Sequence, residues 1–268
     1  MKLLTNLFKK QPPHKIGIAL SGGSARGYAH IGILKALSEH GIEPEIISGT
    51  SMGALIGVLY AAGHSPKDIE KIFIDELVKK VMTFSWQRTG LLKMEKLPGV
   101  LKKYLPEDDY SCLKKPFYLG ITNLNSGKSE FLSKGKLYSS LIATSSVPGV
   151  FTPIVIDGTS YVDGGLLCNL PASAIREKCK ILIGAHVNFP GEKKILSGTR
   201  EILERVVNLG ITQNTQPEKE LCDFLIDPPE MRNFSLLDFG KIEEIIEVGY
   251  SHTNRMIEVG ELSGVFRR

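Results

Sequence analysis

The sequence contains no apolar run long enough to span a bilayer and no closely spaced pair of cysteines. A membrane-crossing helix needs about 18–20 apolar residues in succession, and no stretch of this chain reaches that length. The absence of a C-x-x-C pair argues against a zinc site or a redox dithiol. We therefore expect buried or idle thiols in a reducing compartment, with a disulfide left open, at Cys112, Cys168, Cys179 and Cys222.

A strong excess of one charge is also missing. The chain has 33 Lys and Arg against 29 Asp and Glu, a formal net charge of +4. This mild charge is spread along the chain, so it does not indicate nucleic-acid binding. It permits a slight preference for anionic membrane surfaces. Neither a metal-ligand motif nor an internal repeat is visible.

The amino-terminal segment has a short apolar patch between lysines. The patch is too short for a secretory signal, and no small-residue cleavage site follows it. We expect residues 1–14 to form a flexible leader, with a weak membrane-surface anchor as the alternative.

Short β-branched runs alternate with helical patterns along most of the chain. The expected strands lie at 15–20, 45–48, 117–133 (a pair around an Asn-Ser-Gly turn), 153–165 (a hairpin turning at Asp157-Gly158), 180–187 and 223–228. The expected helices lie at 25–41, 52–63, 65–80 (with Ser65 as cap and Pro66 at its first position), 199–214 and 240–260. This order predicts an α/β fold of three αβα layers with a mostly parallel central sheet. The least regular stretch is 81–110, for which a peripheral helix pair is favoured over a mobile lid.

Ser51 lies in the sequence GTSMG, which fits G-x-S-x-G. The preceding strand is expected to end near Ser48 and the next helix to begin near Met52, which is the strand-turn-helix that exposes a nucleophilic serine. Gly49 and Gly53 let neighbouring backbone come close. The helix amino terminus behind Ser51 favours developing negative charge. The pattern therefore favours a nucleophile over a serine that only caps a helix.

A serine hydroxyl needs a base to take its proton. Among the six histidines, His186 is the best candidate for a Ser-His-Asp triad, because it ends an expected strand and follows Ser51 in the chain. However, no H-G-G motif precedes Ser51. The other candidate is Asp163, since Gly164-Gly165 after it allow a tight turn that leaves the carboxylate facing open space. An Asp-Gly turn is usually structural, so the residues alone leave both bases open.

Gly22-Gly23 lie between the first expected strand and the first expected helix. Such a loop aims successive backbone N–H groups at one point, which suits an anion. The loop fits neither G-x-x-x-x-G-K-[ST] nor G-x-G-x-x-G, so a nucleotide phosphate is disfavoured. An oxyanion hole is a better use, in which each donor contributes about 3–4 kcal/mol.

The sequences LSGGSARG, GTSMG and VDGG, taken together, resemble the patatin-like phospholipase family of the bacterial type with a single patatin domain. Weaker similarities are ATSSVPGVFTPI before the aspartate, NLP after it and SLLDFGKIEEIIEVGY near the end. The resemblance implies a patatin-like fold over residues 15–258, followed by a tail at 259–268. It covers nearly the whole chain and is far more specific than any one motif.

The resemblance also implies a mechanism. Ser51 would be the nucleophile and Asp163 its only partner, in a dyad without histidine, metal or cofactor. The substrates would be fatty-acyl esters of phospholipids or lysophospholipids. Arg26 matches the family's basic position, where it would either steady the loop or meet the lipid phosphate. The oxyanion hole would be formed by Gly22, Gly23 and Ser24, with support around the dyad from Gly49, Gly53, Gly164 and Gly165.

Ser24 departs from the family pattern, which often has a third consecutive glycine at this position. A serine still supplies its N–H, but it disfavours a positive φ.

The basicity of Asp163 is a second question, because a solvated aspartate with a pKa near 4 is a feeble base. The apolar sequences FTPIVI and LLCNLP on its two sides are expected to raise its pKa.

Two other functions stay open at this level. One is a Ser-His-Asp esterase or thioesterase, and the other is a lipid-binding module that uses the same fold without turnover. For the hydrolase we expect a phospholipid or lysophospholipid partner and no nucleic acid. We also expect a cytoplasmic protein whose membrane contact is peripheral and on the inner face. The oligomeric state is open.

Overall fold

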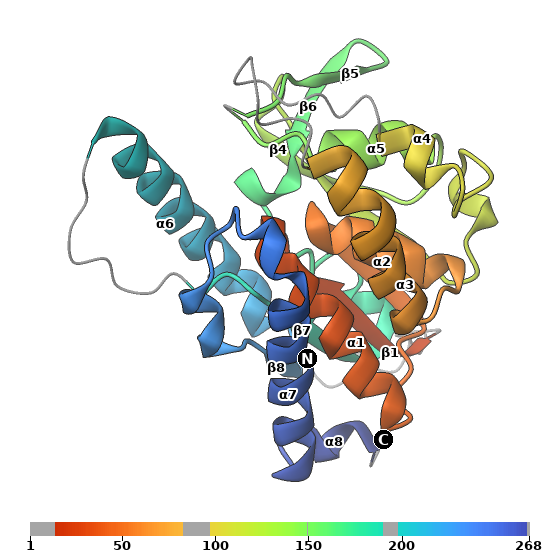
Figure 1. Ribbon diagram of the computed structural model, residues 1–268. Coiled ribbons are helices and arrows are strands. Elements are labelled where there is room, and N and C mark those ends of the chain that lie inside the picture. Colours follow the sequence, from red (N-terminus) through yellow and green to blue (C-terminus); the bar gives the residue numbers. More distant parts are fainter. Residues whose placement is uncertain (1–13, 83–96, 149, 190–197, 267–268) are drawn as a thin grey trace, which may run out of the picture.

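The computed structural model describes residues 14–82, 97–148, 150–189 and 198–266. A mixed sheet runs through the middle and helices flank it (Figure 1). The strands are β1 (His14–Leu20), β2 (Ile46–Thr50), β3 (Phe117–Asn123), β4 (Lys128–Leu132), β5 (Ile154–Ile156), β6 (Thr159–Asp163), β7 (Cys179–Ala185) and β8 (Phe224–Ile226).

The helices follow the strands in the expected alternation. The α-helices are α1 (Ala29–Glu39), α2 (Met52–Ala62), α3 (Pro66–Ile72), α4 (Leu97–Leu101), α5 (Leu137–Thr144), α6 (Thr199–Glu220), α7 (Ile242–Glu258) and α8 (Ser263–Phe266). A π-helix, η2 (Phe73–Met82), continues α3. Short 3-10 turns are η1 (Ser24–Tyr28), η4 (Tyr110–Cys112), η5 (Gly164–Leu166), η6 (Arg176–Lys178), η7 (Pro229–Asn233) and η8 (Phe239–Lys241).

The strand order is β5-β6-β3-β2-β1-β7-β8, with β4 also paired to β3. The pairs β1–β2, β1–β7, β2–β3 and β7–β8 are parallel. The two expected hairpins, β3–β4 and β5–β6, supply antiparallel pairs, as does β3–β6. The α/β fold predicted from the sequence is confirmed.

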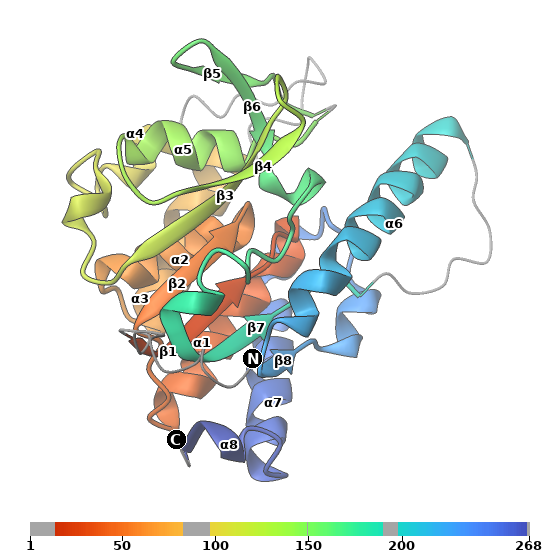
Figure 2. The same cartoon turned by 180° about the vertical axis from the view of Figure 1, so that it is seen from behind.

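Side chains alternate between the two faces of the sheet, and each face has its own apolar cluster. On β1, Ile16, Ile18 and Leu20 join the larger cluster, which includes residues of α1, α2, α5 and α7. Ala19 points the other way, into a smaller cluster with Leu170, Ala172, Ala174 and Ile175. Figures 1 and 2 show α1 and α7 side by side on the first face. The sheet is therefore covered on both faces.

Two segments differ in detail from the sequence expectation, and a third lies only partly within the described residues. The first helix begins at Ala29, because residues 24–28 form the 3-10 turn that leaves the glycine loop. The chain after Glu258, expected to be a tail, forms α8, and its Leu262 and Val265 are buried in the core. Of the stretch 81–110, residues 83–96 lie outside the described residues, and α4 after them packs into the core.

The predicted cap of α3 is present, since Ser65 and Asp68 form a reciprocal capping box with Pro66 at the first helical position. All four cysteines are free thiols. Among the helices in the described ranges, none is long and apolar enough to cross a membrane.

Candidate active site

Ser51 lies on a sharp turn between the end of β2 and the start of α2. Its backbone has φ 53° and ψ −124°, a conformation that non-glycine residues adopt only under strain. Thr144, at the end of α5, holds the turn, because its hydroxyl oxygen accepts the N–H of Ser51 at 2.9 Å. The same hydroxyl donates to the carbonyl of Gly120 on β3 at 2.6 Å. The elbow is therefore fixed to two elements besides its own.

Gly49 and Gly53 are needed because backbone segments meet closely at this elbow. A Cβ on Gly49 would lie 2.6 Å from the Gly53 carbonyl oxygen, and one on Gly53 would lie 2.4 Å from the Leu20 carbonyl oxygen. Any side chain would push α2 away from β1 and β2. The supporting role expected for these two residues thus has a steric basis in the described contacts.

The sheet brings Asp163 to Ser51 through the edge of β3. Strand β2 pairs with the first half of that edge and ends with Thr50 opposite Gly120. Strand β6 runs in the opposite direction and ends with Asp163 opposite Ile121. Because β4 occupies the other edge of β3, β2 and β6 share one edge and meet end to end. Their last residues therefore face each other.

The two side chains are in direct contact. The Ser51 hydroxyl donates to Asp163 Oδ2 at 2.6 Å, and the Gly165 N–H donates to Asp163 Oδ1 at 2.7 Å. Burial raises the pKa of Asp163 from 3.8 to about 6, although both hydrogen bonds act in the opposite direction. The direction of the shift is the one expected from the sequence, and its cause is burial. The carboxylate is thus a stronger base than a solvated aspartate.

The glycine loop differs from the expectation at Gly22. Its N–H donates to the backbone carbonyl of Asn169 at 3.0 Å, so it is not available to bind an oxyanion. Among the described residues, no hydrogen bond is recorded for the N–H groups of Gly23 and Ser24, whereas the next one, of Ala25, donates to Leu236. The loop therefore offers two free donors rather than three, and the assignment of Gly22 as a donor is corrected.

Ser24 adopts φ 49°, so the loop does place a left-handed residue where the family often has glycine. Arg26, two residues on, is partly buried and points into the protein. Its Nε donates to the Phe234 carbonyl at 2.8 Å and its Nη1 to the Phe189 carbonyl at 3.5 Å. Burial lowers the pKa of Arg26. These contacts favour the loop-steadying role over contact with a lipid phosphate.

His186, the alternative base, makes a different pair. Its Nδ1 donates to Asp227 Oδ1 at 2.9 Å, and Lys219 Nζ contacts Asp227 Oδ2 at 2.7 Å. Burial opposes the charge on Asp227, but the hydrogen bonds and charges of His186 and Lys219 keep its pKa below the usual value. The Ser51 hydroxyl bonds to Asp163 instead. The described residues therefore do not form a Ser-His-Asp triad at Ser51.

His30 and two asparagines complete the surroundings of the loop. His30, expected to pack inside the first helix, is fully buried and donates to the Ser21 carbonyl at 2.8 Å. Asn188 Nδ2 donates to the Gly22 carbonyl at 2.5 Å. The sequence reasoning missed Thr144, Asn169 and Asn188. Thr144 lies in ATSSVPG and Asn169 lies in NLP, and these two weaker family similarities were the only hint in the sequence that the residues belong to the site.

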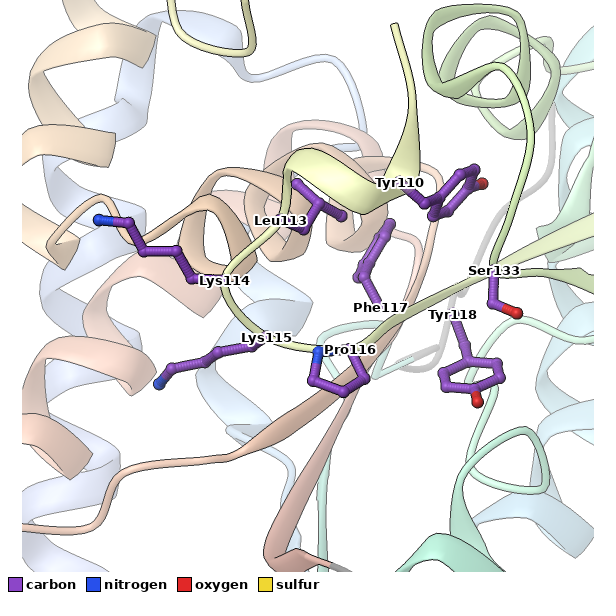
Figure 3. Close-up of a pocket in the computed structure, with 8 residues that line it drawn as sticks. All are labelled: Tyr110, Leu113, Lys114, Lys115, Pro116, Phe117, Tyr118 and Ser133. Atoms are coloured by element: carbon purple, nitrogen blue, oxygen red, sulfur yellow. The ribbon is translucent and has the colours of Figure 1, made fainter. Parts of the chain in front are cut away.

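A surface cavity of about 340 Å³ lies at the amino end of β3 (Figure 3). Its lining includes Lys114, Lys115, Phe117 and Tyr118. Lys115 is already held there by the Pro44 carbonyl and the Tyr60 hydroxyl. Since none of the candidate catalytic residues lines this cavity, we do not assign it to the site.

Curated relatives match most of this chain but are longer. A lysophospholipase NTE1 of Kluyveromyces lactis is 26% identical over 278 residues, covering 91% of this chain and 19% of its own length. An uncharacterized NTE family protein of Mycobacterium tuberculosis is 33% identical over 163 residues, covering 60% of this chain and 45% of its own length. The chain thus spans less than half the length of either relative.

A solved structure shares the fold. VipD from Legionella pneumophila superposes with a TM-score of 0.56 at 16% identity, over 92% of this chain and 67% of its own. A family model described as patatin-like phospholipase matches residues 18–175, which contain the glycine loop, Ser51 and Asp163. The fold, the order of these motifs and the extent of the match agree, and the chain belongs to the patatin-like phospholipase family.

Proposed function

We propose that this protein is a serine acyl hydrolase that cleaves fatty-acyl esters of phospholipids or lysophospholipids through a dyad of Ser51 and Asp163. The observation that carries the proposal is the 2.6 Å hydrogen bond from the Ser51 hydroxyl, on its strained elbow, to the buried carboxylate of Asp163. Membership of the family supports lipid-ester chemistry. So does the name of the relative from Kluyveromyces lactis.

In the acylation step, Ser51 Oγ attacks the ester carbonyl carbon while Asp163 takes the hydroxyl proton. A new bond forms between oxygen and carbon, and the carbonyl π electrons move to its oxygen. The unpaired N–H groups of Gly23 and Ser24 support that negative charge. When the tetrahedral intermediate collapses, the alcohol leaves and takes the proton back from Asp163.

In the deacylation step, Asp163 is again a carboxylate and takes a proton from water. The resulting hydroxide attacks the acyl carbon, and the bond to Ser51 Oγ breaks. The proton returns to Ser51, and the fatty acid leaves. One carboxylate with a pKa raised to about 6 by burial can act in both steps, because its pKa lies near neutral pH.

The direct test is a lipid panel with fatty-acid release as the readout, together with labelling by a fluorophosphonate probe. We expect release from at least one phospholipid or lysophospholipid and covalent labelling at Ser51. The Ser51→Ala variant, which loses the hydroxyl, should show neither. If wild type is not labelled and releases no fatty acid while it still binds lipid, a binding module is the correct function.

We further propose peripheral contact with the inner face of a membrane, through the β5–β6 hairpin that leads into Asp163. Val155 on β5 is 65% exposed. Leu124 is also exposed, and its N–H donates to the carbonyl of Ser160, the residue paired with Val155. Figure 1 shows this hairpin projecting from the sheet, at the end of the molecule remote from α8. Apolar side chains in this place would enter the lipid interface next to the dyad.

Val155→Asp is therefore expected to lower kcat/KM on phospholipid vesicles about tenfold, since burying one valine is worth about 1.5 kcal/mol or more. Hydrolysis of a water-soluble short-chain ester should stay within about twofold of wild type. Val259 is a matched control, because it is 64% exposed but lies at the carboxyl end of α7. Equal losses for Val155→Asp and Val259→Asp would rule out docking by the hairpin.

A further inference from the structure

The side-chain amide of Asn169 is buried, and its nitrogen has no hydrogen-bond partner among the described residues. Asn169 is 4% exposed and follows the η5 turn after Asp163. Its Nδ2 is buried without a hydrogen-bond partner among the described residues. Native proteins seldom leave such a donor unmet, and a catalytic role is one recognised reason for an exception. This amide therefore needs an explanation that packing alone does not supply.

Asn169 lies between the glycine loop and the aspartate turn. The point where a Cβ on Gly22 would stand is 2.5 Å from Asn169 Oδ1 and 3.2 Å from Ser51 Cβ. The corresponding point on Gly165 is 3.0 Å from both Asn169 Oδ1 and Asp163 Oδ1. The amide thus flanks one glycine together with the nucleophile and another together with the base.

In the structure the amide oxygen, rather than the nitrogen, is the atom nearest these two glycines. Among the described residues, Asn169 Nδ2 has no hydrogen-bond partner. A half-turn about the Cβ–Cγ bond exchanges the oxygen and the nitrogen, and it breaks no hydrogen bond of Nδ2. The side chain can present its N–H group to the side on which Gly22, Gly165 and Ser51 lie.

The backbone of the same residue explains why a donor is needed there. The Asn169 carbonyl accepts the N–H of Gly22, which removes this group from the oxyanion hole. The loop is left with the N–H groups of Gly23 and Ser24. A side-chain amide next to Gly22 would replace the donor that the loop has lost.

We propose that the Asn169 side chain is a third hydrogen-bond donor to the oxyanion formed on the substrate, beside the N–H groups of Gly23 and Ser24. The inference rests on the proposed function, since it concerns the same tetrahedral intermediate. No proton is transferred to or from the amide. As the bond from Ser51 Oγ to the acyl carbon forms, the amide N–H donates to the oxygen that gains the negative charge.

The test compares Asn169→Ala with Asn188→Ala. The second asparagine also touches Gly22, but its amide is already satisfied by the Gly22 carbonyl. Asn169→Ala is expected to lower kcat by about 10²–10³-fold with KM within about twofold. Asn188→Ala is expected to lower kcat less than tenfold and to lower the Tm, because it removes a made hydrogen bond. Asn169→Ser, whose hydroxyl is too short to replace the amide, provides a second variant with the same expected loss of kcat.

A transition-state analogue separates a donor from a merely structural residue. A trifluoromethyl ketone with the acyl chain of the substrate forms a charged tetrahedral adduct on Ser51, so its affinity for Asn169→Ala should fall by the same factor as kcat/KM. The inference is overturned if kcat stays within about threefold of wild type, or if ketone affinity is unchanged. This outcome is distinct from failure of the proposed function, because wild type would still hydrolyse lipid and Ser51 would still be labelled. If wild type does neither, the proposed function is wrong and this inference is wrong with it.

Discussion

Replacing Asp163 with asparagine is expected to lower kcat for ester hydrolysis by between about 10²- and 10⁴-fold. The variant keeps the size of the side chain. It also keeps an oxygen that can accept the Gly165 N–H, which in the wild-type structure lies 2.7 Å from Asp163 Oδ1. It loses the ability to take the proton of Ser51. The measurement is fatty-acid release at saturating substrate, with labelling by a fluorophosphonate as a second readout of serine reactivity.

The same substitution is expected to make the protein more stable at neutral pH. The pKa of Asp163 rises from 3.8 in the unfolded chain to about 6 in the folded protein, so the folded state binds the proton more tightly. Ionisation therefore destabilises the fold as the pH rises from about 4 to 6, and the cost at pH 7 is roughly 3 kcal/mol. Asparagine removes this cost. We expect a higher Tm at pH 7 and little difference from wild type near pH 4.

The acid limb of the pH profile follows from the same group. Asp163 acts as a base only when it is ionised, so kcat/KM of wild type should fall as the pH drops through about 6. A profile that stays flat from pH 5 to 8 would contradict the assignment of Asp163 as the base. So would an Asp163→Asn variant with nearly full activity.

His186→Ala is the control that distinguishes the dyad from a triad. His186 is 1% exposed and bonds to Asp227 rather than to Ser51. Its removal should lower the Tm, because Asp227 loses a hydrogen bond and a small cavity forms. In a dyad, kcat should change only a few-fold. In a triad, kcat would fall as far as in Asp163→Asn.

Sequence patterns predicted those parts of the site that depend on neighbouring residues. The β-branched run before Ser51 and the helical pattern after it placed the serine at a strand-to-helix turn, and the structure has this turn. The capping residue Ser65 was predicted together with Pro66 at the first helical position, and the structure adds its partner Asp68 three residues away. Local backbone geometry depends on a few neighbouring residues, so such features can be predicted from the sequence alone.

Contacts between residues far apart in the chain could not be predicted from local sequence patterns. Ser51 and Asp163 are 112 positions apart, and their contact requires β2 and β6 to share one edge of β3. Only the family resemblance indicated that pairing. The hydrogen bond from Gly22 to Asn169 is another long-range contact. A glycine-rich loop predicts several exposed N–H groups, but it does not indicate which of them the rest of the fold occupies.

Gly53→Ala is expected to cause a large loss of stability for the addition of a single methyl group. A Cβ at this position would lie 2.4 Å from the carbonyl oxygen of Leu20 and 2.5 Å from that of Ser21. Both atoms are backbone, so no side-chain rotation can relieve the contact. Overpacking of a tight interior typically costs 1–3 kcal/mol, and a clash with backbone should reach about 3 kcal/mol or more.

The clash should also affect chemistry, because it pushes the first turn of α2 away from β1. Ser51 immediately precedes that turn, and Ser21 leads into the glycine loop, so nucleophile and oxyanion donors would move apart. We expect slower fluorophosphonate labelling as well as a lower urea midpoint. Gly210→Ala is the matched control, since Gly210 lies in α6 with nothing within 4 Å of its Cβ position. That variant should gain roughly 0.5–1 kcal/mol from helix propensity. A Gly53→Ala protein as stable as Gly210→Ala would show that α2 and β1 can separate without cost.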